Sequence, residues 1–261
     1  MAVVMCLWSL VLAMEITTVL FDMDSTLNTI DELAFSSKYF KMLHNKYFSE
    51  LDVQYFYETL TEITKKVMFS RLPRERNIKT FMQEMAKYYK RKPKKLYADF
   101  LEFYSNDYNE LSVYVQPAEF GREAVQLCLD KGLEIVLATT PIFPEIAIKK
   151  RMDWSGLSDF EFKLVTHAEN MYFCKPREEY YLEILKKIKR KAENCIMVGN
   201  EFLTDIVGPI KIGMPTFHCS ENPQKDSLFV SPELERFSKL QPTFRGNLQT
   251  FISLVKRDFQ V

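Results

Sequence analysis

The fold of this chain is decided by one stretch, Val19-Leu20-Phe21-Asp22-Met23-Asp24-Ser25-Thr26-Leu27. Its apolar start is typical of a buried strand, and the strand runs directly into two carboxylates spaced by one residue. Burying such a pair is unfavourable unless a cation or hydrogen bonds compensate. One alternative is that the acids only cap a following helix. Their place at a strand end, where open parallel sheets bind ligands, favours a cation-assisted functional site.

Three more apolar runs end in small or polar residues, as the first one does, and from residue 117 onward they alternate with helical patterns. The expected strands are Ile135–Ala138, Cys195–Val198 and Pro215–Phe217, and the clearest helices are Glu119–Asp130 and Glu178–Arg190. Alternating strands and helices predict an α/β fold whose parallel central sheet is covered by helices on both faces.

Residues 30 to 111 contain no strand-like run, and their apolar residues keep helical spacing throughout. Four stripes are visible, and the clearest consists of Val53, Phe56, Leu60, Ile63 and Val67. We interpret the stripes as the hydrophobic core of an inserted four-helix domain instead of a cofactor site. The predicted domains are therefore a discontinuous α/β core, residues 1–28 and 116–261, and a helical cap, residues 29–115.

The amino-acid composition indicates which class of molecule the protein binds. Lys plus Arg and Asp plus Glu both number 35, so no net charge favours binding to nucleic acid, and a small-molecule substrate fits better. The five cysteines are odd in number and lack metal-ligand spacing, which indicates reduced thiols in a cytoplasmic compartment. Two basic runs, around Pro93 and at Lys186–Lys191, are interpreted as solvated surface. We expect a monomer or a homodimer.

The first fourteen residues, MAVVMCLWSLVLAM, are almost wholly apolar. They lack a basic leading region and are too short to span a bilayer core of about 30 Å as a helix. Met14 begins a stretch that resembles a natural start, so residues 1–13 are interpreted as an upstream extension. No association with a membrane is expected.

Three further motifs follow the first in a fixed order. Thr139 and Thr140 end the second strand, Lys175-Pro176 stands at the head of a helix, and Gly199-Asn200-Glu201 ends a third strand, with Asp205 beyond. Taken together with the Asp22 stretch, they resemble the four motifs of the haloacid dehalogenase (HAD) superfamily over nearly the whole chain from Ile16. The resemblance implies an HAD-like, Rossmannoid three-layer core with a helical cap of the C1 type, which closes over the site on hinges near 28–31 and 111–115.

The resemblance also implies a role for each matching residue. Asp22 matches the nucleophile and Asp24 the general acid and base of the phosphatases in the family. Phosphate is expected to bind at Thr26, Thr139, Thr140 and Lys175, with Thr139 and Lys175 also catalytic. Mg²⁺ is expected on the carboxylate of Asp22 and the backbone carbonyl of Asp24, with further ligands from Asn200, Glu201 and Asp205. The implied enzyme is a Mg²⁺-dependent phosphomonoester hydrolase that acts on a small phosphorylated metabolite through an aspartyl-phosphate.

Three positions depart from the usual family pattern. Ser25 replaces a Gly, Thr140 replaces an Asn, and Asn200 replaces a metal-binding Asp. Three other functions therefore stay open: a phosphomutase, a 2-haloacid dehalogenase, which the presence of Asp24 disfavours, and a non-catalytic binding protein with the same fold. The histidines, His44, His167 and His218, lack partners at metal-ligand spacing and are expected in ordinary polar roles.

Overall fold

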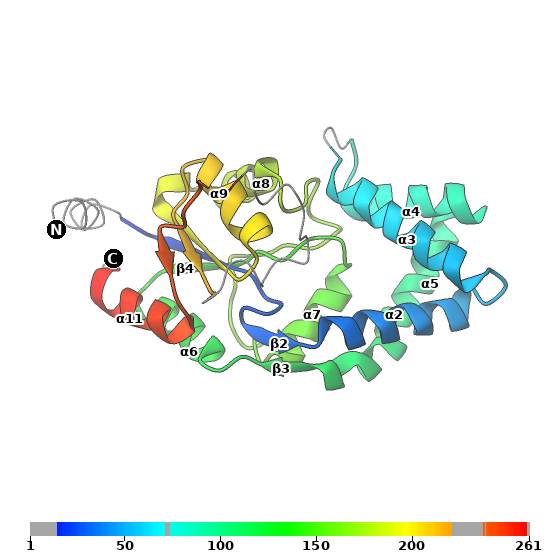
Figure 1. Cartoon of the computed structure of the whole chain (residues 1–261), viewed down its shortest axis with the longest axis horizontal. Helices are drawn as coiled ribbons and strands as arrows, with labels where there is room; N and C mark the ends of the chain where they lie inside the picture. The colour runs from blue at the N-terminus through cyan, green and yellow to red at the C-terminus, as the bar shows by residue number, and fades with distance from the viewer. Residues whose placement is uncertain (1–14, 71–73, 221–236, 238, 260–261) are drawn as a thin grey trace.

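The computed structural model describes residues 15–70, 74–220, 237 and 239–259. The predicted upstream extension, residues 1–13, lies outside the described residues. Figure 1 shows a sheet flanked by helices, with a group of helices extending to one side of it. Within the described part of the chain, no helix is both long enough and apolar enough to cross a membrane.

The central sheet is parallel and has the strand order β5-β4-β1-β6-β7-β8. The strand bounds are β1 Thr18–Phe21, β4 Glu134–Leu137, β5 Leu164–Val165, β6 Cys195–Gly199, β7 Thr216–His218 and β8 Phe244–Arg245. Strand β1 lies between β4 and β6, and Phe21 is in register with Leu137 and Val198. The parallel α/β prediction is thus confirmed, and the ends of β1, β4 and β6 meet at one edge of the sheet.

Successive residues of a strand point to opposite faces of the sheet, and in β1 both sets are buried. Helices therefore cover both faces. Val19 and Phe21 pack in one apolar cluster with α6 (Gly121–Asp130) and α11 (Leu248–Asp258), whereas Leu20 packs in another with α8 (Glu178–Ile188). Helices α6 and α11 lie below the sheet in Figure 1, and α8 and the short α9 (Gly208–Lys211) lie above it. A further helix, α7 (Glu145–Trp154), connects β4 to β5.

A two-stranded antiparallel ribbon, β2 (Asn28–Ile30) with β3 (Val115–Pro117), leads out of the sheet region and back. Between its strands lie α2 (Glu32–Tyr47), α3 (Val53–Met68), α4 (Asn77–Tyr89), α5 (Pro93–Ser105) and the 3-10 helix η1 (Asp107–Tyr114). We call residues 32–114 the helical insert. Asp31 and Asp52 cap α2 and α3 by accepting hydrogen bonds from backbone nitrogens. The predicted domain boundaries, 28/29 and 115/116, fall inside the ribbon.

The apolar stripes of the helical insert pack together, mostly as their spacing predicts. Phe56, Leu60, Ile63 and Val67 are buried in one cluster, but Val53, at the start of the same stripe, is 46% exposed. Its position in the first turn of α3 explains this, because the stripe reaches the core only from the second turn. The insert also touches the α/β core away from the ribbon, since Asn77 N donates to Met171 O at 2.9 Å.

Candidate active site

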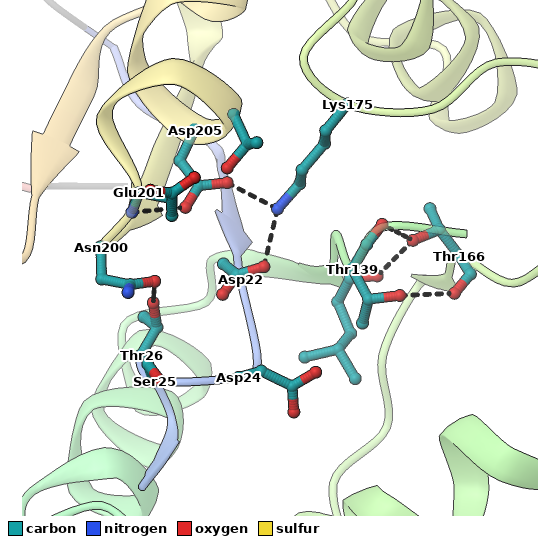
Figure 2. Close-up of polar contacts among 12 residues, drawn as sticks. Asp22, Asp24, Ser25, Thr26, Thr139, Thr166, Lys175, Asn200, Glu201 and Asp205 are labelled. Carbon is teal, nitrogen blue, oxygen red and sulfur yellow. Dashed lines mark hydrogen bonds and ion pairs between the residues drawn. The ribbon is translucent and has the colours of Figure 1, made fainter. Parts of the chain in front are cut away.

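Three charged side chains from separate parts of the sequence meet beyond the sheet edge. Asp22 follows β1, Lys175 lies in the loop before α8, and Asp205 lies on η3 (Phe202–Val207), a π-helical turn after β6. Lys175 Nζ lies 2.7 Å from Asp22 Oδ1 and 2.7 Å from Asp205 Oδ1, as Figure 2 shows. Lys175 and Asp205 are each 1% exposed and Asp22 is 9% exposed, so this is a buried ion-pair network.

The single positive charge of Lys175 does not fully offset the burial of Asp22 and the negative charges around it. Burial raises the pKa of Asp22 to about 7; Lys175 opposes the rise, whereas the charges of Asp205 and Asp24 add to it. Burial disfavours a charged Lys175, but Asp205 and Asp22 hold its pKa well above the ordinary value, so it stays an ammonium ion. A second cation near Asp22 would relieve the remaining cost of ionising this carboxyl group.

Asp24 points in another direction. Figure 2 shows its carboxylate turned away from Lys175 and Asp205. Asn28 Nδ2 donates to Asp24 Oδ1 at 3.1 Å, and Arg151 Nη1 of α7 forms an ion pair with Asp24 Oδ2. The Asp24 side chain is 30% exposed, so it borders both solvent and the buried Arg151.

The turn after β4 is fixed by reciprocal hydrogen bonds with a neighbouring threonine. Thr139 Oγ1 donates to Thr166 O at 3.1 Å, and Thr166 Oγ1 donates to Thr139 O at 3.0 Å. Tyr180 Oη of α8 also donates to Thr139 O at 2.7 Å. Thr139 is buried and Thr140 is half-buried, so the predicted phosphate-binding turn is rigid, with the Thr139 hydroxyl engaged inside the protein.

In the fourth motif, Asn200 contacts the first motif, whereas Asp205 contacts Lys175 and the Glu201 backbone. Thr26 Oγ1 donates to Asn200 Oδ1 at 3.1 Å, which joins the motif to the first one. Asp205 Oδ2 accepts from the backbone nitrogen of Glu201 at 3.0 Å, while its other oxygen accepts from Lys175. A Cβ at Gly199 would overlap the Asp205 carboxylate, so only glycine fits there.

The oxygen atoms around Asp22 limit which kind of metal ion could bind there. Among the residues that the structure describes, no three His, Cys, Asp or Glu side chains form a group that could hold one. Mg²⁺, however, is usually held by one or two carboxylates with other oxygens, water and substrate phosphate. The Asp22 carboxylate, whose negative charge is only partly offset, and the amide oxygen of Asn200 would suit such a small set of oxygen ligands.

The three histidines have polar partners, in agreement with the roles expected for them. His44 Nε2 lies 3.0 Å from Leu51 O, and His167 Nδ1 lies 2.9 Å from Glu169 Oε2. His218 is buried on β7, and its Nε2 lies 2.8 Å from Asn200 O. The last contact places a histidine directly behind the fourth motif, where it supports the Asn200 backbone.

A family model described as haloacid dehalogenase-like hydrolase matches residues 16–213 of the chain. The chain belongs to this family. The chain is also similar to pyrophosphatase PpaX from Halalkalibacterium halodurans, with 30% identity over 210 residues, which cover 78% of this chain and 83% of the relative. The predicted membership of the HAD superfamily is thereby confirmed, and the chain is a hydrolase.

Solved structures show the same fold for this haloacid dehalogenase-like hydrolase. An HAD phosphatase from Thermococcus onnurineus superposes with a TM-score of 0.59 at 14% identity, covering 94% of this chain and 100% of the other. An L-2-haloacid dehalogenase from Xanthobacter autotrophicus gives a TM-score of 0.56 at 13% identity, covering 93% and 99%. At these identities the likeness concerns the fold alone.

The structure of this haloacid dehalogenase-like hydrolase brings together most of the residues singled out from the sequence. Asp22, Lys175 and Asp205 form one cluster, and Thr26 with Asn200 forms a second. Sequence reasoning missed Arg151 and Asn28, which hold Asp24, and Thr166, which holds Thr139. Asn28 lies four residues after Asp24, so its nearness in the sequence could have suggested a contact with Asp24. No local pattern marks Arg151 or Thr166.

Proposed function

We propose that this phosphatase-type hydrolase acts on a small phosphorylated metabolite, requires Mg²⁺, and forms an aspartyl-phosphate on Asp22. The observation that carries the proposal is the buried contact of Lys175 with both Asp22 and Asp205. A lysine held permanently charged beside the Asp22 carboxylate can offset the negative charge that phosphate brings to it.

The proposed reaction has two steps. In the first, an oxygen of Asp22 attacks phosphorus, the bond from phosphorus to the leaving oxygen breaks, and Asp24 gives a proton to that oxygen. In the second, water attacks phosphorus, Asp24 takes a proton from the water, and the bond between phosphorus and Asp22 breaks. Thr26, Thr139, Thr140 and Lys175 are the proposed phosphate-binding residues. The fixed turn at Thr139 supports this role for its backbone donors, because a rigid turn holds them in place. The Thr139 hydroxyl donates to Thr166 O and would have to rotate to reach phosphate.

Phosphatases of the family generally use a divalent metal, and we propose Mg²⁺ for this chain. The Asp22 carboxylate, the Asp24 backbone carbonyl and Asn200 are the proposed ligands, with Glu201 and Asp205 as further candidates. Asn200 is favoured over Asp205, because Asp205 is already paired with the buried Lys175 ammonium and its second oxygen accepts from Glu201 N, whereas Asn200 Oδ1 accepts from the neutral Thr26 hydroxyl. When bound, the ion would neutralise charge on the phosphoryl group.

The relatives add a second candidate substrate. Several matching curated proteins are named pyrophosphatase PpaX, among them the Halalkalibacterium halodurans protein and one from Bacillus cereus. Inorganic pyrophosphate therefore belongs beside phosphomonoesters in any screen. A phosphomutase would share the Asp22–Lys175 contact and differ only in the acceptor of the phosphoryl group, so product analysis must separate the two.

The test is a screen of phosphomonoesters and pyrophosphate with Mg²⁺ and with a chelator, run on the parent protein, Asp22→Asn and Asp52→Asn. Asp52 caps α3 in the helical insert, and Asn caps equally well, so Asp52→Asn is the matched control. We expect metal-dependent phosphate release by the parent and the control, and a loss of about 10⁴-fold or more in Asp22→Asn.

Borohydride should also reduce a trapped aspartyl-phosphate at Asp22 to homoserine, which mass spectrometry detects. Phosphate release by Asp22→Asn close to that of the parent would exclude Asp22 as the nucleophile. A folded parent protein that releases no phosphate from any compound in the screen would favour the binding-protein alternative. Halide release from 2-haloacids without a metal would favour a dehalogenase.

A further inference from the structure

Arg151 occupies an unusual position for an arginine. It follows two lysines on α7, and those lysines face outward: Lys149 pairs with Glu145, and Lys150 donates to Ser105 O at 2.7 Å. Arg151 turns inward and is only 3% exposed. Arginine is rarely buried this fully unless it has a partner, and the carboxylate it reaches is Asp24.

The guanidinium of Arg151 lies over an aromatic ring that also packs against the helical insert. The ring of Phe143, just beyond the β4 turn, has its centre 4.6 Å from the guanidinium carbon. The Phe143 ring in turn packs against Tyr39 and Tyr104 of the helical insert, with ring centres 5.8 Å and 6.5 Å away. The charge of Arg151 partly counteracts the rise in pKa that burial causes at Tyr108. The guanidinium thus lies over the Phe143 ring while it is paired with Asp24.

The other Asp24 oxygen is held by Asn28 of β2, which is linked to the end of the same helix. Asn28 Nδ2 donates to Asp24 Oδ1 at 3.1 Å and to Ser155 Oγ at 3.0 Å. Ser155 Oγ in turn donates to Arg151 O at 2.6 Å, at the end of α7. Each carboxylate oxygen of Asp24 therefore has a donor, and both donors depend on one turn of α7.

We propose that Arg151 is a positioning residue that orients the Asp24 carboxylate for proton transfer, and that it is itself held by Phe143, which packs against the helical insert. The proposal rests on the proposed function of Asp24 as general acid and base. A carboxylate that is 30% exposed can rotate into solvent, whereas proton transfer requires it within hydrogen-bond reach of the reacting oxygen. Asn28 restrains one Asp24 oxygen with a neutral hydrogen bond, and Arg151 restrains the other with an ion pair.

The test compares Arg151→Met, Arg151→Lys and Asp24→Asn, singly and with Arg151→Met added to Asp24→Asn. Because Arg151 acts through Asp24, we expect Arg151→Met to lower kcat by about 10- to 100-fold while KM changes less than about threefold. Arg151→Lys should recover part of the loss. In the Asp24→Asn background, Arg151→Met should cause no further loss, since the residue it orients no longer transfers a proton.

The matched control is Arg122→Met. Arg122 also pairs with one carboxylate, Asp159, and also lies over a phenylalanine ring, that of Phe160, at 4.6 Å. It lies on α6, and kcat should stay unchanged in this variant. An equal fall of kcat in Arg122→Met, or losses that multiply when Arg151→Met is combined with Asp24→Asn, would overturn the proposal.

A crystal structure of Arg151→Met provides a readout that does not depend on turnover. We expect the Asp24 carboxylate to leave the position shown in Figure 2 or to occupy several conformers, while Asp22 and Lys175 keep their contact. An unmoved Asp24 would overturn the positioning role, even if the screen of substrates had found no activity. Absence of phosphate release by the parent, in contrast, would contradict the proposed function without bearing on the position of Asp24.

Discussion

Asn77 Nδ2 lies 3.0 Å from the carbonyl oxygen of Pro141, so a residue of the helical insert donates a hydrogen bond to the turn that follows β4. The same nitrogen lies 3.2 Å from Cys174 Sγ, next to Lys175 in the chain. The first residue of α4 thus bridges the Thr139 turn and the Lys175 loop. The sequence predicts hinges only near 28–31 and 111–115, and this buried contact gives the insert an additional attachment to the core.

We predict that Asn77→Ala lowers the free energy of unfolding by about 1–3 kcal/mol, because two buried acceptors lose their donor. Urea denaturation measures the change. Asn45→Ala, at an exposed position of α2, is the control and should stay within about 0.5 kcal/mol of the parent. Equal stabilities of the two variants would mean that the Asn77 bridge adds nothing to the folded state.

Lys175→Met should be strongly destabilising as well as inactive. It leaves the Asp22 and Asp205 carboxylates buried without their shared cation, at a cost of about 3–5 kcal/mol. Adding Asp205→Asn removes one of the two charges, so part of the lost stability should return while activity does not. Thermal unfolding and phosphate release measure the two effects separately. Full recovery of activity in the double variant would show that Lys175 serves only to neutralise Asp205.

The pH dependence of stability should carry the signature of Asp22. Its pKa is raised from 3.8 to about 7, so between these values the folded, metal-free protein binds a proton that the unfolded chain releases. Stability from this group is full below pH 3.8 and is lost as pH rises through about 7. Asp22→Asn removes the loss, so the variant should be more stable than the parent at pH 8 without metal. Parallel stability curves for the two proteins from pH 4 to pH 8 would contradict the raised pKa.

Asn200→Asp should strengthen metal binding. A carboxylate attracts a divalent cation more strongly than an amide oxygen does, and the donor from Thr26 can serve either group. We expect the Mg²⁺ concentration for half-maximal activity to fall by about 10-fold, the equivalent of about 1.4 kcal/mol. A metal titration of phosphate release measures it. If the Mg²⁺ concentration for half-maximal activity did not change, Asn200 would not be a metal ligand.

Much of the fold could be predicted from local patterns. The apolar runs ending at Asp22, Thr139 and Gly199 are strands in the structure, because a buried parallel strand needs only a short, continuous apolar segment. Strands β5 and β8 have two residues each, too few to produce such a run, so no prediction included them. The approach of Lys175 to Asp22 was expected from the family resemblance, since no spacing rule joins a loop lysine to a distant strand.

The residues that sequence reasoning missed are defined by tertiary contacts. The sequence contains three consecutive basic residues, Lys149, Lys150 and Arg151, and each of them alone would be predicted to lie on the surface of a helix. Only the packing of the folded chain decides which one turns inward. Ser25 stands where the family usually has Gly. The structure gives it a φ of 59°, a left-handed conformation that glycine adopts more easily, so the departure does affect the backbone.

The central place of β1 has a consequence for synthesis on the ribosome. Its neighbours, β4 and β6, are translated much later, and 153 positions separate Asp22 from Lys175. A nascent chain must therefore keep an apolar strand shielded until most of the polypeptide has emerged. Chains that terminate before Asp205 would lack one carboxylate partner of Lys175, so aborted translation products should be catalytically silent.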